Sequence, residues 1–431
     1  MLRALLALAL VACASAGPTH TIGDAQVAFH TGGRGPARFV GFVNRSPNRI
    51  AHADVHVTFG MPLPGGDWLV MLDGSLVRFS PDGERVRWSS KVVSVARAVT
   101  AGTDAVIAIG TIADPTALNG QRHAMFRIDA TTGALGWHAQ STAIGGGSGV
   151  ELVRVGTTTI AASFAGATGV DDTGTIQWDE TIPGGTNDPR LVAVGANVVI
   201  VRSPTRMAND FGETPLRHPL SIRVLDAATG VERGRTELVP TEDYYGYNQA
   251  GVAGDGRLVI DGSEVRVHTE RTEVQGKPGI RQTSTSTNKL IVIDLRDPSR
   301  PTAEARAMPA ITDVDLPRGL PVGSITFLDR YAAHGQNLGL RVLDLAANKI
   351  QRAKLFVPTR VHDVDAFVQV THIARHGARL VFAGIFAGDI GALRGRIARV
   401  DQCAAQDYIE CSEGRGEVTL SPFAGFIGVI E

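Results

Sequence analysis

Three side chains that could hold a metal ion stand at alternate positions near the start of the chain: His52, Asp54 and His56. On a β-strand, alternate side chains point to the same face, with about 7 Å between one and the next. Two imidazoles and a carboxylate form a ligand set that zinc and other transition metals accept. A polar strand face without a metal has the same pattern, so both interpretations stay open.

A tyrosine-rich segment offers a second candidate site, for binding rather than for catalysis. Tyr244, Tyr245 and Tyr247 are three of the five tyrosines in the chain, and Asn248 follows them. Tyrosine combines a large apolar ring with a polar tip at a low cost in conformational entropy, which suits the recognition of proteins or sugars. We expect this segment to connect two structural repeats and to bind a partner; local packing is the alternative.

The start of the chain predicts export. Arg3 precedes an apolar stretch that ends at Cys13 and is too short to span a bilayer as a helix of about 20 residues. The stretch resembles a bacterial lipoprotein signal, in which Cys13 is acylated and becomes the first mature residue; Ala14 behind it is typical of sorting to the outer membrane. Ordinary cleavage after Ala16 is the alternative, so residues 1–16 hold the expected signal peptide.

The other two cysteines, Cys403 and Cys411, stand eight residues apart. In an oxidising compartment outside the cytoplasm we expect them to form a disulfide, which would stabilise the fold by about 2–3 kcal/mol. Two free thiols are the alternative. A metal site at these cysteines is disfavoured because no Cys-x-x-Cys pair and no neighbouring histidine accompany them.

Charge and motifs argue against several functions. The formal net charge is −1 and the pI is about 6.9, so the chain lacks the surplus of basic residues with which proteins bind nucleic acids. It also lacks a Gly-x-Ser-x-Gly elbow, a His-Glu-x-x-His helix and a phosphate-binding loop. We therefore expect no cofactor and lean against an enzyme, while a metal ion and an active site of dispersed residues stay open.

The elements that must position these residues are short strands in a repeated unit. The clearest copy, residues 124–137, has a strand that ends at Asp129, a turn that ends at Gly133 and a second strand that reaches Trp137. Related turns lie near residues 80, 171, 226, 294, 344 and 401, usually with an apolar strand ahead of the turn strand. The turns follow one another at intervals of about 42 to 68 residues, which matches a four-stranded propeller blade.

The pattern predicts an all-β fold, a β-propeller of four-stranded antiparallel blades. Seven blades are the best count, with six or eight as alternatives. Residues 54–431 would form the propeller and residues 17–53 would help to close it. Because a propeller closes by pairing strands from the two chain ends, we expect residues 26–29 and 426–430 to supply that pair.

Two long insertions distinguish the middle of the chain. Residues 203–219 and 263–288 each fall between the second and third strands of a repeat. In a propeller, loops at this place emerge on the same face as the connections between blades. We therefore expect both insertions beside the tyrosine segment, on a face elaborated for contact; loop tolerance without function is the alternative.

The turns and the tryptophans that follow them resemble the repeats of the PQQ-like β-propeller family. Asp129 to Trp137 fits the repeat well, Asp172 to Trp178 and Asp226 to Gly230 fit it in part, and the resemblance covers residues 54–425. One branch of the family, the quinoprotein dehydrogenases, binds pyrroloquinoline quinone (PQQ) and calcium with a pair of adjacent cysteines that this chain lacks. A non-catalytic branch includes the outer-membrane assembly lipoprotein, which this chain resembles in architecture, size and signal.

Together, the signal, the repeats and this resemblance imply an exported, lipid-anchored propeller that binds proteins or acts as a scaffold at the cell envelope. They imply protein partners, a monomeric state and a place at the bacterial outer membrane; without acylation of Cys13 the protein would be periplasmic or secreted. The alternative is an enzyme, either a divergent quinoprotein that binds PQQ or a carbohydrate-active propeller. For the fold, WD-repeat proteins are the alternative, with Trp178-Asp179 as a single match to their dipeptide.

Overall fold

The computed structural model describes residues 19–22, 25–34, 37–44, 57–72, 75–81, 85–90, 93–113, 121–141, 149–181, 189–203, 217–253, 255–274, 277–314, 325–328, 338–355, 360–361, 364–376, 379–388, 398–399, 417–418 and 425–430. Within these ranges the chain folds into strands joined by turns, and no helix there could span a membrane. The predicted all-β fold is confirmed.

Five sheets of four strands follow one another between residues 57 and 307, and we call them blades 1 to 5. In each, every strand pairs antiparallel with the next, so the order in the sheet is the order in the sequence. Their strands are β4 (Val57–Pro62), β5 (Trp68–Leu72), β6 (Ser75–Phe79) and β7 (Val86–Ser90); β8 (Val93–Ala101), β9 (Ala105–Ala113), β10 (Gln121–Asp129) and β11 (Leu135–Ala139); β12 (Glu151–Val155), β13 (Thr158–Ser163), β14 (Gly166–Val170) and β15 (Ile176–Thr181); β16 (Arg190–Val194), β17 (Asn197–Arg202), β18 (Leu220–Asp226) and β19 (Glu232–Leu238); and β20 (Tyr244–Val252), β21 (Arg257–Val274), β22 (Lys277–Asp294) and β23 (Thr302–Ala307).

A sixth sheet, blade 6, differs at its outer edge. Strands β25 (Ile325–Leu328), β26 (Leu338–Asp344) and β27 (Lys349–Leu355) pair antiparallel as predicted, whereas β24 (Ile311–Val314) pairs parallel to β27. The parallel pair arises because β24, which precedes β25 in the sequence, lies at the opposite edge of the sheet.

The two ends of the chain meet in a seven-stranded sheet, in which β33 lies between β3 and β30. The chain ends therefore pair through β3, not through residues 26–29, which lie in β2, one strand further from β33. Both β2 and β3 have apolar residues that suit a sheet, so the sequence pattern alone did not show which of them pairs with β33.

The blade count of seven and the domain bounds stay predictions. The remaining strands are β1 (Thr19–Ile22), β2 (Ala25–Arg34), β3 (Ala37–Asn44), β28 (Arg360–Val361), β29 (Val364–His376), β30 (Arg379–Gly388), β31 (Ala398–Arg399), β32 (Glu417–Val418) and β33 (Gly425–Ile430).

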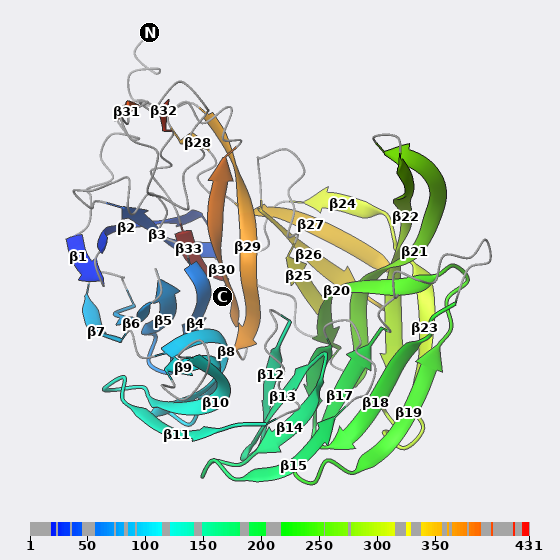
Figure 1. Cartoon of the computed structure of the whole chain (residues 1–431), viewed down its shortest axis with the longest axis horizontal. Helices are drawn as coiled ribbons and strands as arrows, with labels where there is room; N and C mark the ends of the chain where they lie inside the picture. The colour runs from blue at the N-terminus through cyan, green and yellow to red at the C-terminus, as the bar shows by residue number, and fades with distance from the viewer. Residues whose placement is uncertain are drawn as a thin grey trace.

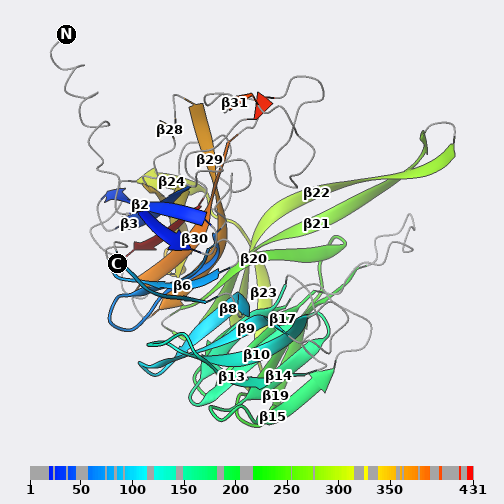
Figure 2. The same ribbon diagram turned by 60° about the vertical axis from the view of Figure 1, so that its left-hand side comes forward.

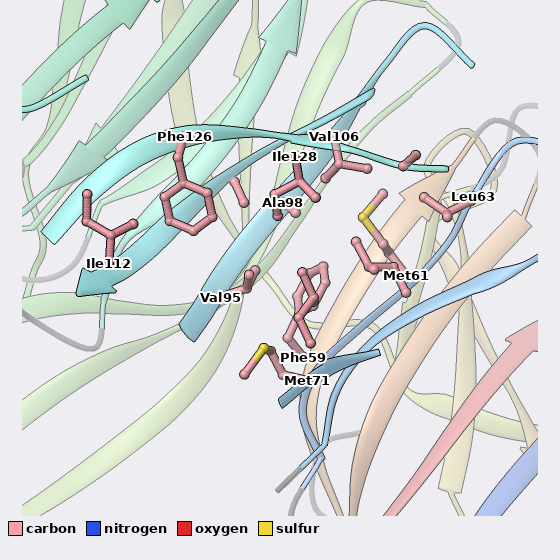
Figure 3. Packing of buried hydrophobic residues seen from close by; sticks show 14 of the residues in the cluster. Phe59, Met61, Leu63, Met71, Val95, Ala98, Val106, Ile112, Phe126 and Ile128 are labelled. Atoms are coloured by element: carbon pink, nitrogen blue, oxygen red, sulfur yellow. The ribbon is translucent and has the colours of Figure 1, made fainter. Parts of the chain in front are cut away.

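The blades follow one another around a common axis (Figure 1), as the propeller fold predicts. The first strands of successive blades are in contact, namely β4 with β8, β8 with β12, β12 with β16, β16 with β20, and β20 with β25 of blade 6. Buried side chains fill the space between sheets: Phe59 and Met61 of blade 1 lie in one cluster with Phe126 and Ile128 of blade 2 (Figure 3). Burial on both faces explains why the four residues in the middle of β17, Val198 to Val201, are all apolar.

A tryptophan in the last strand of blades 1, 2 and 3 joins each blade to the next. The indole Nε1 donates a hydrogen bond to a backbone oxygen in the next blade, from Trp88 to Ala130 at 3.1 Å, from Trp137 to Asp172 at 2.8 Å and from Trp178 to Ala227 at 2.9 Å. Each ring also covers a turn glycine with φ between +70° and +88°, namely Gly133, Gly174 and Gly230. The repeated tryptophan and glycine are thus the two halves of one contact between blades.

The aspartate of the repeat holds the same turn in shape. In blade 2, Asp129 Oδ1 accepts hydrogen bonds from the N–H groups of Thr131 and Thr132 and from the Thr132 hydroxyl, at 2.8 to 2.9 Å. Asp226 makes the equivalent bonds in blade 4. In blade 3 the residue that accepts these hydrogen bonds is Asp171 and not Asp172, the position predicted from the sequence. Such side-chain bonds satisfy turn N–H groups that no strand pairs.

Blade 4 breaks the pattern, because Gly234 stands four residues after Gly230, where blades 2 and 3 have tryptophan. A Cβ on Gly234 would lie 2.5 Å from the backbone oxygen of Pro298 and 2.9 Å from Pro301 Cδ. The backbone of the blade 5 turn therefore occupies the space that an indole fills elsewhere. This explains the absence of a tryptophan from the fourth repeat.

Candidate binding face

The antiparallel order of the strands gives the propeller two different ends. One end carries the Asp-x-x-Thr-Gly turns between third and fourth strands, and we call it the turn face. The other end carries the turns between second and third strands together with the connections from one blade to the next, and we call it the connection face. Val231 and Val239, at the two ends of β19, mark the turn face and the connection face. Both insertions begin and end at the connection face, as their place in the sequence predicts.

The structure places the tyrosine segment inside a sheet and not in a connection. Tyr244 to Asn248 form the first half of β20, the innermost strand of blade 5, and Tyr244 pairs with Val265 of β21. A bulge interrupts the register between Tyr247 and Gln249, at Asn248. The strand begins at the connection face, so the expected neighbourhood of the segment is correct although its secondary structure is not.

The three tyrosines differ in their surroundings. Tyr245 is 3% exposed and belongs to the apolar cluster between blades 4 and 5. Burial raises the pKa of the Tyr245 hydroxyl, and the nearby Glu264 carboxylate acts in the same direction. Tyr247 packs against the same cluster, whereas Tyr244 is half-buried and Asn248 is exposed. Tyr244 and Asn248 are therefore the members of the predicted site that a partner can reach most easily.

An extended hairpin of β21 and β22 projects from blade 5 beyond the other strands (Figure 2). Its two strands pair continuously from Arg257 opposite Asp294 to Val274 opposite Lys277. The predicted insertion of residues 263–288 is thus a continuation of two blade strands. The other insertion lies between β17 and β18, and residues 204–216 of it fall outside the described ranges.

Two buried carboxylates fasten the base of this hairpin. Asp243 is 1% exposed; its Oδ2 accepts a hydrogen bond from the Val267 N–H at 2.7 Å, and its own N–H donates to the Val265 oxygen at 3.1 Å. These bonds continue the pairing of β20 with β21 past Tyr244. The backbone oxygen of Asp243 also accepts a hydrogen bond from the His218 N–H at 2.8 Å. This bond joins the end of the other insertion to the base of the hairpin.

Glu264, 5% exposed, is the second carboxylate. Its Oε1 accepts hydrogen bonds from the N–H and the hydroxyl of Thr241 and from the N–H of Glu242, and Lys289 Nζ lies 3.2 Å from its Oε2. Burial alone would raise the pKa of Glu264, but these donors hold it below its usual value. The carboxylate therefore stays ionised and ties the connection before β20 to both strands of the hairpin.

Three innermost strands contribute side chains to a charged row beside Tyr247. Arg190 of β16 forms an ion pair with Glu151 of β12, and its guanidinium carbon lies 5.7 Å from the centre of the Tyr247 ring. The row links blades 3, 4 and 5 near the connection face. The Arg190 guanidinium binds both the Glu151 carboxylate and the face of the Tyr247 ring. These two contacts hold the three strands of the candidate face together.

Several predicted residues lie outside the described ranges: Cys13, His52, Asp54, His56, Cys403 and Cys411. The lipid anchor, the metal site and the disulfide therefore stay predictions. Among the residues that are described, no group of three or more His, Cys, Asp or Glu side chains is arranged to hold a metal ion.

The residues that organise this face could not be recognised from the sequence; they are Asp243, Glu264, Lys289, Glu151 and Arg190. A charged residue inside a polar segment carries no signal of burial by itself. Glu264 meets Thr241 only through the register of β20 against β21. The alternation of β20 does separate Tyr244 from Tyr245 and Tyr247, and that signal was available once the segment was treated as a strand.

No protein-family model matches the chain, and no curated protein matches it. Among solved structures, BamB from Moraxella catarrhalis is 14% identical, with 85% of this chain and 92% of that chain covered and a TM-score of 0.38. Hydrazine synthase from Kuenenia stuttgartiensis is 12% identical, with 68% and 78% covered and a TM-score of 0.42. The Pan2 WD40 domain from Neurospora crassa is 13% identical, with 80% and 90% covered and a TM-score of 0.35. Likenesses this distant assign no function to the chain.

Proposed function

We propose that this protein is an exported β-propeller that binds protein partners through the connection face of blades 4 and 5 and acts as a scaffold at the cell envelope. The fastening of the projecting hairpin carries the proposal. Burial of a carboxylate is costly unless several donors compensate it, and here Asp243 and Glu264 are both buried at the hairpin base. A loop without a function does not need buried hydrogen bonds at its base. A hairpin that contacts a partner binds it more tightly when it is already held in one orientation.

Tyr244 and Asn248 suit a protein partner beside this hairpin. An aromatic ring with a polar tip supplies contact area at little entropic cost, and an asparagine adapts its hydrogen bonds to the surface that it meets. Large exposed apolar side chains do not single out this face, because they occur at both ends of the propeller, with Phe164 and Val239 at one and Ile176 and Val231 at the other. The extensions and the tyrosine segment distinguish the connection face.

Export, the lipid anchor and the PQQ-like family form the second part of the proposal. The signal in residues 1–16 supports export, and Cys13 at the end of its apolar stretch supports acylation and a place at the outer membrane. The Asp, Gly and Trp positions of the repeats support the PQQ-like family, and the absence of two adjacent cysteines from the sequence favours its non-catalytic branch. An oxidising compartment would also allow the disulfide between Cys403 and Cys411.

Mass spectrometry of the mature protein tests this second part. We expect an acylated Cys13 as the first residue and, in a non-reducing peptide map, a peptide pair joined through Cys403 and Cys411. A mature chain that starts at Gly17 without lipid would overturn the anchor and leave a periplasmic or secreted protein. Free thiols at both C-terminal cysteines would overturn the disulfide.

Affinity capture of the tagged full-length protein from the cells that make it tests the binding face. We expect replacement of both Tyr244 and Asn248 by Ala to lower the recovery of cross-linked partners at least tenfold. The matched control is Val231→Ala, an exposed substitution on the turn face, which should leave recovery unchanged. Equal recovery from the wild type and from both variants would show that the partner binds elsewhere.

A further inference from the structure

The first described strand lies close in sequence to the proposed lipid anchor. Only residues 14–18 lie between Cys13 and Thr19, where β1 begins. A fully extended chain spans about 3.3–3.6 Å per residue, so Thr19 can lie at most about 20 Å from an acylated Cys13. The start of β1 therefore stays within about 20 Å of the membrane surface, and this step rests on the acylation of Cys13 proposed above.

Strand β1 forms one outer edge of the seven-stranded sheet in which the chain ends meet, here called the closing sheet. Its register sets Thr19 opposite Ala28 and Ile22 opposite Ala25. On its other side β2 pairs with β3, which ends at Asn44, from where the chain passes to blade 1. This end of the closing sheet therefore belongs to the connection face. Thr19 is set back from it by three residues of strand, or about 10 Å.

The β21–β22 hairpin projects from the other side of the molecule. In both views β2 and the hairpin lie on opposite sides of the ring (Figures 1 and 2). Tyr244 pairs with Val265 where β20 begins, at the connection face, and β21 continues for nine more residues to Val274. At 3.3 Å per residue they carry the hairpin about 30 Å beyond the connection face. This projection is longer than the reach of the tether.

The side chains of the hairpin do not suit the interior of a bilayer. Arg266, His268 and Glu270 are exposed on β21, and every residue from 281 to 288 on β22 is exposed and polar. Charged and polar groups are costly to move into hydrocarbon. If the connection face lay toward the membrane, the hairpin would hold Thr19 about 40 Å from the surface, which is about twice the length of the tether.

We propose that the anchor holds the outer edge of the closing sheet at the membrane and keeps the connection face of blades 4 and 5 turned away from it. The partner then reaches Tyr244 and the hairpin from the aqueous phase, so it contacts this face with a water-soluble domain and not with a membrane-embedded one. Asp243 and Glu264 fasten the base of the hairpin and keep its direction fixed. The hairpin thus acts both as a contact element and as a spacer from the bilayer.

Fluorescence quenching by lipids with a nitroxide at the headgroup tests this orientation. The acylated full-length protein is bound to vesicles of phosphatidylethanolamine and phosphatidylglycerol, with a fluorescent amino acid in place of Thr21, Val239 or Ser284. Because quenching needs close approach, it should be at least threefold stronger at position 21 than at positions 239 and 284. The matched control has about twelve Gly and Ser residues inserted after Pro18. They lengthen the tether about threefold and should at least halve the quenching at position 21.

Flotation of the vesicles separates the orientation from the anchor. Protein that does not float with them would overturn the anchor, and the orientation with it. For protein that floats, quenching at position 239 or 284 as strong as at position 21 would overturn the orientation alone. The absence of quenching at position 21, or quenching there that the longer tether does not reduce, would overturn it as well.

Discussion

Trp137 covers Gly174 of the next blade so closely that a Cβ on this glycine would lie 2.7 Å from the indole ring. The same indole donates a hydrogen bond to the Asp172 oxygen at 2.8 Å. Gly174 also has a φ of +88°, a conformation that favours glycine. One glycine therefore meets two requirements, the turn of its own blade and the surface on which the preceding blade packs.

Replacement of Gly174 by Ala should lower the free energy of unfolding by about 3 kcal/mol. The positive φ accounts for about 1 kcal/mol, and the displacement of the Trp137 ring accounts for the rest. Gly156→Ala is the matched control, because Gly156 also has a positive φ of +59° but has no atom within 4 Å of the added Cβ. Chemical denaturation of both variants measures the difference. Equal losses would mean that the tryptophan contact does not constrain the turn.

Gly234→Ala should destabilise the protein by about 1–3 kcal/mol although its φ is not positive, since the added methyl group would overlap the Pro298 oxygen. The control is Gly136→Ala in β11, where the nearest atom to the added Cβ is the Arg127 oxygen at 3.4 Å. That substitution should cost less than about 1 kcal/mol. A Gly234 variant as stable as the wild type would contradict the close approach of blades 4 and 5.

Asp226 should stabilise the protein at neutral pH and lose that effect in acid. The hydrogen bond from Arg233, followed by that from Thr229, lowers the pKa of Asp226 to about 2. A carboxyl whose pKa is lower in the folded state contributes stability above its unfolded pKa of about 3.9, and the contribution disappears as the pH falls through about 2. Asp226→Asn should therefore cost about 1 kcal/mol at pH 7 and progressively less below pH 4. A pH-independent difference in denaturation midpoints would contradict this.

Two tyrosines of β20 should differ in their effect on stability, with Tyr245 as a structural residue and Tyr244 as a surface residue. Tyr245→Ala removes a buried ring from the cluster between blades 4 and 5 and should cost about 3–4 kcal/mol. Tyr244→Ala, at a half-buried position, should cost less than about 1 kcal/mol. Thermal melting of the two variants checks this, and a destabilised Tyr244 variant would place Tyr244 in the core as well. Binding experiments therefore need Tyr245 intact.

The repeated residues predicted the fold because each one shapes a local turn and the same turn recurs in successive blades. Asp129, Gly133 and Trp137 recur with the turn that they build, so their spacing reveals the blade before any long-range contact is known. Gly234 shows the limit of this signal, since the missing tryptophan is explained only by the neighbouring turn of blade 5.

The candidate face was less accessible to sequence reasoning because it depends on register. Asp243 and Gly246 are residue types common in turns, which favoured a connection where β20 begins. Residues 263–288 are polar and appeared to be an insertion, yet both strands of the hairpin continue through them without a shift in register. The role of Glu264 follows only from that pairing.

Site-specific photocrosslinking in the cells that make the protein shows which face of the propeller contacts the partner. A photoreactive residue at Val239 probes the connection face, and the same residue at Val231 probes the turn face; the two valines are 58% and 59% exposed and lie at opposite ends of β19. If the partner binds the connection face, position 239 should give a discrete crosslinked protein adduct and position 231 should give none. An adduct from position 231 alone would contradict the assignment of the connection face as the binding face.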